Sequence, residues 1–274
     1  MKRIPRILAA ALCVLLLAGA PSPVSAQGQP GRKGGPPFAG SSPISVQNVR
    51  GKVYLVKGGS GANAGFFVAG KEVLVIDAKM TEEAAQGMMA EIKKVTPNPV
   101  IRVALTHGDG DHSSGLAGFP QGIQIISQEN TRASMSNAPG SARQQASLPN
   151  ITFSDKLSLY LAGDSKTTRV DLLYFGPAHT NGDAVVFFPE EKVAFVGDLV
   201  TMGRDPLIHR AKGGDSAGLV KVLKTLLSLD ADTFLSGHAD PATRKDVEDL
   251  VKRLEEKQTG SQGPGGGEAR KDAR

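Results

Sequence analysis

Cysteine and tryptophan are almost absent from this chain of 274 residues, which contains one cysteine, Cys13, and no tryptophan. Cys13 lies in the apolar segment at the N-terminus, so a protein that has lost this segment contains neither a disulfide nor a thiolate. Any metal site would then be built from His, Asp and Glu, a donor set that suits Zn, Fe or Mn rather than a sulfur-rich centre. The fold must also be stable without cross-links, for which roughly 200 ordered residues around one core suffice.

Aromatic residues make up only 5% of the chain, and neither sign of charge dominates it. The formal net charge is +5, but three of the 32 basic residues lie among the first six positions, which leaves 29 basic against 27 acidic residues. Nucleic-acid binding ordinarily requires a basic patch and, for single strands, aromatic stacking platforms. The composition therefore argues against a nucleic-acid partner; the partner expected is a small-molecule substrate.

Residues 1–26 have the composition of a secretory signal peptide. A positively charged start precedes the apolar run 7–20, and Val-Ser-Ala before Gln27 is a small-x-small cleavage site. The apolar run is shorter than the ~20 residues that a membrane span needs. We therefore expect a periplasmic or secreted protein with no stable membrane span after cleavage; an uncleaved membrane anchor is the alternative.

The rest of the chain is expected to form one domain between two irregular ends. Residues 27–43 are rich in Gly and Pro and carry almost no apolar periodicity, which predicts a disordered linker. Residues 258–274 predict a disordered tail for the same reason. The predicted domain spans residues 44–257.

Short apolar runs alternate with helical patterns in this domain, which is typical of an α/β fold. Thr81, for example, has acidic residues directly behind it and begins a predicted amphipathic helix. Strands are predicted at 44–49, 53–58, 64–70, 72–78, 100–105, 169–176, 184–188, 192–198 and 232–237, and helices at 81–95, 128–138, 215–230 and 242–257.

Two parts of this order resemble each other. In the first, a strand ends at Asp77, a helix follows, and the next strand runs into His107. In the second, a strand ends at Asp198, a helix follows, and the next strand runs into His238. Two such halves would stack as two sheets with helices outside, and ligand sites in α/β layers lie at the carboxyl ends of the strands.

Ionisable side chains gather after these strands, most densely in the stretch THGDGDHSSG, residues 106–115. A lone histidine at a strand end ordinarily only hydrogen-bonds a neighbouring carbonyl. Several carboxylates that converge would raise each other's pKa unless a cation neutralised them, and neighbouring glycines would leave room at so crowded a centre. The candidate metal ligands are His107, Asp109, Asp111, His112, His179, Asp198 and His238.

The order of these residues resembles the metallo-β-lactamase superfamily. The pattern H-x-[HDE]-x-D-H at 107–112, a histidine about seventy residues later, and then the pairs Gly-Asp and Gly-His span most of the predicted domain. The resemblance implies an α/β fold of the four-layer αβ/βα sandwich type, with two mixed β-sheets and outer helices. It also implies one or two metal ions at one rim, Zn in the first instance and Fe or Mn as alternatives.

The resemblance further implies a role for each residue. The first metal would take His107, Asp109 and His179, the second Asp111, His112 and His238, and Asp198 would bridge them. Asp77 and Asp183 would lie behind the ligands, where Asp183 could orient one of them. Asp111 would also carry the proton of the attacking water to the leaving group.

Asp109 departs from the family pattern, which usually has histidine at this position. An aspartate still ligates a hard cation, but its charge would make bound water less acidic and favour Fe or Mn over Zn. Two metals are expected if Asp109 ligates. If it does not, the first site is weak, and one metal or none is bound.

The activity implied is that of an exported metal-dependent hydrolase, in which a metal-bound hydroxide attacks an ester, thioester, lactone or lactam bond. The extra carboxylate keeps open a non-haem iron oxidoreductase acting on sulfur species or oxygen. A non-catalytic metal-binding accessory protein is the third possibility. His209, Arg210 and Lys212, in the loop after Asp198, are the predicted substrate-binding residues, and the two cations would bind a substrate carboxylate.

Overall fold

The computed structural model describes residues 42–137, 147–163 and 167–260. The predicted signal peptide, residues 1–26, and all but the last two residues of the predicted linker, 27–43, lie outside the described residues, as does most of the predicted tail, 258–274. None of the described helices combines the length and the apolar character that a membrane span requires.

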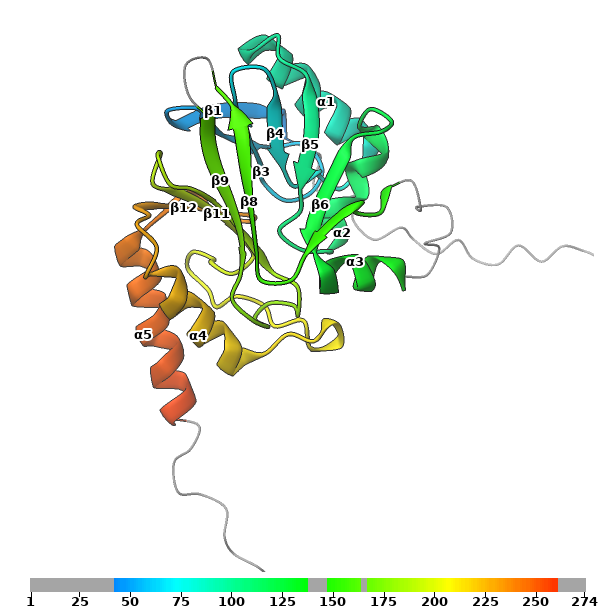
Figure 1. The fold of residues 1–274 in the computed structure, drawn as a ribbon. Helices are drawn as coiled ribbons and strands as arrows, with labels where there is room; N and C mark the ends of the chain where they lie inside the picture. The colour runs from blue at the N-terminus through cyan, green and yellow to red at the C-terminus, as the bar shows by residue number, and fades with distance from the viewer. Residues whose placement is uncertain (1–41, 138–146, 164–166, 261–274) are drawn as a thin grey trace, which may run out of the picture. The chain divides into compact units, whose positions relative to one another are not determined.

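Seven strands form the first sheet of the described chain, in the order β1 to β7 (Figure 1). The first four are an antiparallel meander: β1 (Ser45–Arg50), β2 (Val53–Lys57), β3 (Ala64–Val68) and β4 (Val73–Ile76). The rest add in parallel: β5 (Val100–Ala104), β6 (Gln124–Gln128) and β7 (Ile151–Phe153). The sheet is therefore mixed, as predicted.

The second sheet has six strands within the described ranges, in the order β13-β12-β11-β10-β9-β8. Its antiparallel part consists of β8 (Lys156–Ala162), β9 (Thr167–Tyr174), β10 (Ala184–Phe188) and β11 (Val193–Gly197). β12 (Thr233–Ser236) pairs in parallel with β11, and β13 (Ala242–Thr243) closes the sheet in antiparallel pairing with β12.

Helices lie outside the two sheets, and apolar side chains fill the space between layers. The main helices are α1 (Glu82–Val95), α3 (Glu129–Ser136), α4 (Ser216–Leu226) and α5 (Arg244–Gly260). Side chains of both sheets interdigitate in one core, where the rings of Phe67 and Phe188 stack at 5.2 Å. α1 packs on the first sheet through Met88 and Ile92, while α4 and α5 pack on the second (Figure 1). These layers confirm the predicted four-layer αβ/βα sandwich.

The sequence patterns missed four strands: β6, β7, β8 and β13. β7 and β13 have three and two residues, too few for a period-2 alternation to stand out, and β6 begins and ends with glutamine, so it has only a short apolar run. β8 lies at the edge of its sheet, and its Tyr160 is 69% exposed. Its apolar residues therefore do not all lie on one buried face. α5 also continues to Gly260, beyond the predicted end of the domain at residue 257.

The internal resemblance between the two halves corresponds to matching substructures. β4 and β5 are parallel neighbours joined through α1, and β11 and β12 are parallel neighbours joined through α4. Asp77 follows β4 directly and Asp198 follows β11 directly, while His107 and His238 come shortly after β5 and β12. Since the carboxyl ends of parallel neighbours share an edge, these four side chains are brought to the same rim.

Candidate metal centre

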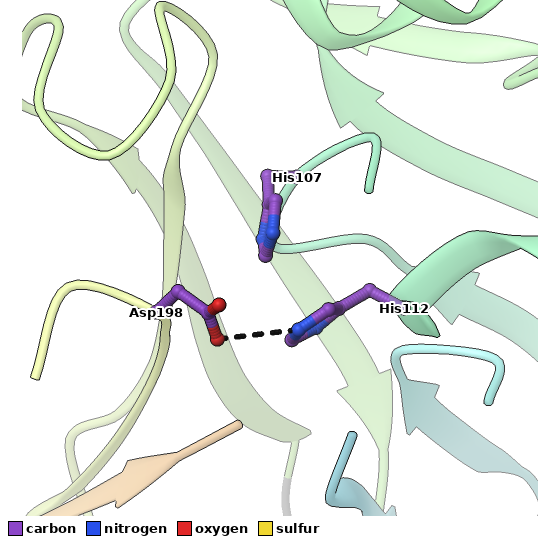
Figure 2. A group of neighbouring side chains, drawn as sticks. All are labelled: His107, His112 and Asp198. Atoms are coloured by element: carbon purple, nitrogen blue, oxygen red, sulfur yellow. Dashed lines mark ion pairs between the residues drawn. The ribbon is translucent and has the colours of Figure 1, made fainter. Parts of the chain in front are cut away.

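All seven predicted ligands come together at this rim. One ligand atom from each of His107, Asp109 and His179 lies within 4.8 Å of the other two, and the same holds for Asp111, His112 and His238. A third group of the same tightness joins His107, His112 and Asp198. The first two groups are the two sets predicted from the sequence, and the third places Asp198 against one histidine of each set (Figure 2).

Asp109 is the carboxylate on which the first group converges. Its Oδ2 lies 3.3 Å from His179 Nε2 and 3.7 Å from His107 Nε2. The two imidazole rings stand edge to face, with centroids 4.7 Å apart. Two Nε2 atoms and one oxygen therefore point into the same space.

Asp111 and Asp198 hold the second group together. Asp111 Oδ2 lies 3.0 Å from His238 Nε2 and 3.7 Å from His112 Nε2. Asp198 Oδ1 lies 3.2 Å from His112 Nε2, and its Oδ2 lies 3.3 Å from His238 Nε2 and 3.9 Å from His179 Nε2. Asp198 thus reaches both groups, which is the position that a bridging ligand requires.

The Nδ1 atoms of three imidazoles are occupied by acceptors on the side away from the centre. His112 Nδ1 donates to Asp77 Oδ2 at 2.7 Å, and His179 Nδ1 donates to the Leu207 carbonyl at 2.8 Å. Thr106 Oγ1 donates to Asp77 and lies 3.0 Å from His107 Nδ1, from which it accepts. A neutral imidazole that donates through Nδ1 keeps its lone pair on Nε2, so each ring is oriented to offer that nitrogen to a metal in the centre.

Asp77 therefore has the predicted position behind a ligand, whereas Asp183 acts through an intermediary. Both oxygens of Asp183 accept hydrogen bonds from Thr180, one from its backbone N–H at 2.8 Å and one from its hydroxyl at 2.5 Å. Thr180 directly follows His179. Asp183 therefore contacts the turn that follows His179 and does not hydrogen-bond an imidazole.

Three atoms at the middle of the centre are buried without a hydrogen-bond partner among the described residues: His107 Nε2, His112 Nε2 and Asp198 Oδ1. They belong to the group drawn in Figure 2, where the three side chains converge. His112 Nε2 and Asp198 Oδ1 lie 3.2 Å apart as an ion pair, but none of the three atoms makes a hydrogen bond to a described residue. Because buried polar atoms are almost always hydrogen-bonded, the three together indicate a missing common partner. Nitrogen and oxygen donors without sulfur fit a divalent transition metal, so the residues present fit the group that the fold implies.

The electrostatics of the centre agree with a site that needs cations. Burial alone would raise the pKa of Asp109 and of Asp198, but the neighbouring histidines hold the pKa of both carboxyls well below the usual range. Hydrogen bonds to Asp111 and Asp198 raise the pKa of His238 to about 9. In the metal-free protein, imidazolium groups thus supply positive charge that a bound metal would supply instead.

The centre opens to solvent on the side of the second group. The side chains of Asp111 and His238 are 31% and 32% exposed, whereas those of His107 and His112 are buried. A cavity of about 660 Å³ adjoins His238 and is lined also by Met202, Asn63 and the ion pair of Lys57 with Asp240. A second cavity, of about 770 Å³, adjoins the first group at Gly108, Gly110 and Lys212.

Gly237 is the glycine that makes room at this centre. A Cβ at residue 237 would lie 2.5 Å from both Asp198 Oδ1 and the His112 ring, a separation that real side chains do not tolerate. The glycines inside the histidine-rich stretch have other neighbours, since Gly108 faces Met135 and Gly110 faces Ser114. The expectation that glycine leaves space thus holds for a residue outside that stretch.

The three predicted substrate-binding residues lie near the first group but face it differently. Lys212 Nζ lies 2.5 Å from Asp109 Oδ1, and His209 Nδ1 lies 3.1 Å from Asp109 Oδ2. Arg210 is exposed at the start of the short helix η4 (Arg210–Lys212). Lys212 thus has a carboxylate partner within the protein, in the first ligand group.

Two residues of the centre had not been identified from the sequence. Lys79 is fully buried, and its Nζ donates a hydrogen bond to the Ala62 carbonyl. Burial lowers the pKa of Lys79 to about 8, although the negative charges of Asp77 and Asp111 act to raise it. Asn63 Nδ2 donates to the carbonyls of Ser236 and Ala239 at 3.1 and 3.0 Å, on either side of His238. No spacing or motif marks either residue, because their partners lie far away in the chain or are backbone carbonyls.

Comparison with curated proteins finds remote relatives of several activities. The chain is 24% identical over 208 residues to 2,4-dinitroanisole O-demethylase subunit alpha of Nocardioides sp. (strain JS1661), covering 75% of this chain and 60% of that protein. It is 29% identical over 143 residues to metallo-beta-lactamase type 2 of Elizabethkingia meningoseptica, covering 52% and 53%. It is 20% identical over 226 residues to linear primary-alkylsulfatase of Pseudomonas sp. (strain ATCC 19151), covering 66% and 42%. The chain thus spans less than two thirds of each relative.

Solved structures share the fold over nearly the whole described region. A metallo-beta-lactamase from Pontibacter korlensis superposes with a TM-score of 0.65 at 19% identity, covering 77% of this chain and 99% of that one. The sec-alkylsulfatase Pisa1 from Pseudomonas sp. gives a TM-score of 0.64 at 16% identity, covering 80% and 42%. The sequence profile of the metallo-beta-lactamase superfamily matches residues 58–238, which include every predicted ligand. With its two-sheet fold and convergent histidines and aspartates, this chain belongs to the metallo-beta-lactamase superfamily.

Proposed function

We propose that this protein is an exported metallo-hydrolase that cleaves an ester, thioester, lactone or lactam bond. The observation that carries the proposal is the set of seven convergent ligand side chains, three of whose buried atoms have no hydrogen-bond partner among the described residues. The metal-bearing superfamily to which the chain belongs supports it. The signal-like composition of residues 1–26 supports export to the periplasm or the medium.

Zn is the metal that we assign to the centre, with Fe or Mn as alternatives. Four imidazoles and three carboxylates suit all three ions, and two groups of three ligands linked by Asp198 provide places for two of them. When bound, metal ions of this kind supply Lewis acidity, which lowers the pKa of water to about 7 and stabilises the negative charge that develops on the attacked group.

Asp111 is the residue that we assign to proton transfer. Its carboxylate belongs to the second group and is partly exposed on the open side of the centre, where substrate and water have access. As the water oxygen attacks the carbonyl carbon, Asp111 would hold the proton that the water gives up. It would then deliver this proton to the leaving oxygen, sulfur or nitrogen as the scissile bond breaks.

The cavity beside His238 is the place that we assign to the substrate. It contacts the open group of ligands and contains the apolar side chain of Met202 as well as the amide of Asn63. Lys57 and Asp240 form an ion pair in its lining, so their charges offset one another. A small molecule of mixed polarity fits such a lining.

Metal analysis followed by a hydrolysis panel tests this proposal. We expect the purified full-length protein to bind up to two equivalents of Zn and to hydrolyse at least one class among esters, thioesters, lactones and lactams. Asp198→Asn should lose metal and activity, because Asp198 reaches both groups. Asp230→Asn is the matched control, since Asp230 is an exposed partner of Lys192 away from the centre. Full-length protein that takes up no transition metal would refute the proposal.

A non-haem iron oxidoreductase is the second candidate, and Asp109 is the observation that favours it. A third carboxylate among the ligands adds negative charge, which favours iron over zinc at the first group. The contact with Lys212 offsets this charge, which is why we place the hydrolase first. Protein loaded with Fe that consumes oxygen or oxidises sulfur compounds, while the Zn form hydrolyses nothing, would reverse this order. Full metal loading without any turnover would instead support a metal-binding accessory protein.

A further inference from the structure

Lys212 and Asp109 form an ion pair at the edge of the first ligand group. Lys212 Nζ lies 2.5 Å from Asp109 Oδ1, so the ammonium contacts one oxygen of the carboxylate. The other oxygen, Oδ2, is the one that lies 3.3 Å from His179 Nε2 and 3.7 Å from His107 Nε2. The two oxygens of Asp109 thus serve different partners: one faces the lysine, the other the imidazoles.

The backbone holds Lys212 in this place. The segment 207–215 is hydrogen-bonded along the turn that carries His179: His179 Nδ1 donates to the Leu207 carbonyl at 2.8 Å, and the His209 N–H donates to the His179 carbonyl at 2.8 Å. Further along, Asn181 N–H donates to the Lys212 carbonyl at 2.9 Å. Since the same backbone contacts place His179 and Lys212, the lysine belongs to the architecture of the first group rather than to a separate surface loop.

We propose that Lys212 is the charge-compensating partner of Asp109. A carboxylate and an ammonium in contact carry no net charge, so the pair offers the metal an oxygen ligand without adding negative charge to the centre. The lysine contacts Oδ1, and Oδ2 is the oxygen that faces the two histidines. Lys212 then sets the metal affinity of the first ligand group and does not bind a substrate anion. The proposal rests on the proposed function only in that the first group binds a metal.

Thermal unfolding of the metal-free, full-length protein tests the pair without any metal or substrate. We expect Lys212→Met to lower Tm by about 2–4 °C, because Asp109 keeps its charge in a buried place but loses a partner. In the double variant Asp109→Asn with Lys212→Met, the loss should be smaller than the sum of the two single losses. Strictly additive losses would overturn the proposed pairing. This result stands whether or not the protein proves to be a hydrolase.

Zinc titration tests whether Lys212 affects the metal affinity of the first ligand group. Removing a positive charge beside the first group should tighten zinc binding at one site by about tenfold and leave the other unchanged. Lys212→Arg, which keeps the charge, should bind as the wild type does. Lys221→Met is the matched control, because it removes a lysine from the exposed side of α4. Unchanged or weaker binding in Lys212→Met would overturn the proposal.

Substrate preference separates this role from that of an anion receptor. With a neutral ester and a matched ester that carries a carboxylate, we expect Lys212→Met to change kcat/KM for both by the same factor. A selective rise of KM for the anionic ester, with zinc affinity unchanged, would show that Lys212 binds substrate and would overturn the proposal. If the wild type hydrolyses neither ester, the unfolding and zinc titrations still decide whether Lys212 compensates Asp109.

Discussion

His112 donates its Nδ1 hydrogen to Asp77 across 2.7 Å, and both side chains are buried. Asp77 also accepts two hydrogen bonds from Thr106, through the backbone N–H and the hydroxyl, both at 2.8 Å. Thr106 thereby holds the Asp77 carboxylate in place, and the carboxylate in turn orients the His112 imidazole. This relationship determines which nitrogen of His112 faces the centre.

Asp77→Asn should therefore weaken metal binding at the second group while leaving the fold intact. An amide has one accepting oxygen, so it can no longer accept from both the Thr106 backbone N–H, which contacts Oδ1, and His112, which contacts Oδ2. Its NH2 group would face one of these two donors, and an NH2 group that faces the ring removes the acceptor that fixes the tautomer and orientation of His112. Loss of such an orienting partner typically reduces metal affinity by about 10- to 100-fold. Zinc titration of the variant measures the effect, and circular dichroism checks that the protein is folded. Wild-type affinity at both sites would show that Asp77 has no orienting role.

Gly237→Ala should disrupt the centre through a single methyl group. The added Cβ would lie 2.5 Å from Asp198 Oδ1 and from the His112 ring, so the ligands would have to move apart. We expect loss of most bound metal, measured by elemental analysis of the purified variant. Gly110→Ala is the matched control inside the histidine-rich stretch, because its new methyl group meets only the Ser114 hydroxyl, at 3.0 Å. Equal metal contents in the two variants would contradict the assignment of Gly237.

Asn63→Ala should loosen the turn that carries His238. Asn63 Nδ2 donates to the carbonyls of Ser236 and Ala239, and its removal leaves these acceptors without that donor. A hydrogen bond contributes about 0.5–1.5 kcal/mol to the free energy of unfolding, so the variant should be less stable, and zinc binding at the second group should weaken as well. Asn48→Ala is the matched control, since Asn48 Nδ2 also donates to two carbonyls, in the exposed hairpin of β1 and β2. Zinc affinity that falls equally in both variants would argue against a specific effect on His238.

The stability of the metal-free protein should depend on pH through His238. Hydrogen bonds to Asp111 and Asp198 raise the pKa of His238 from 6.5 to about 9 in the folded state. The stabilisation is therefore complete below about pH 6.5 and disappears as the pH rises through about 9. We expect Tm of the metal-free protein to fall over this interval and the fall to be smaller in His238→Gln. Zinc should flatten the profile, because a bound metal replaces the protons. An unchanged slope in His238→Gln would contradict this assignment.

Much of the architecture followed from local patterns. The two strand-helix-strand units have Asp77 and His107 in one and Asp198 and His238 in the other. They were predictable because each element has its own apolar period and each polar residue lies at or shortly after the end of a strand. The parallel pairing of β4 with β5 and of β11 with β12 then brings these residues to one rim. The short or half-exposed strands β6, β7 and β8 were not predictable, since their pairing partners and not their own sequences make them strands.

The sequence by itself determined the α/β class, the set of seven candidate ligands and the absence of sulfur among them, because composition and order along the chain are local properties. Only the tertiary structure decided which partners the charged groups have. Lys212 was expected to bind a substrate carboxylate, yet it contacts Asp109, 103 positions away in the chain. Lys79 and Asn63 were not singled out, although both lie at the centre. A side chain's partner depends on where distant segments meet, and no spacing along the chain records that meeting.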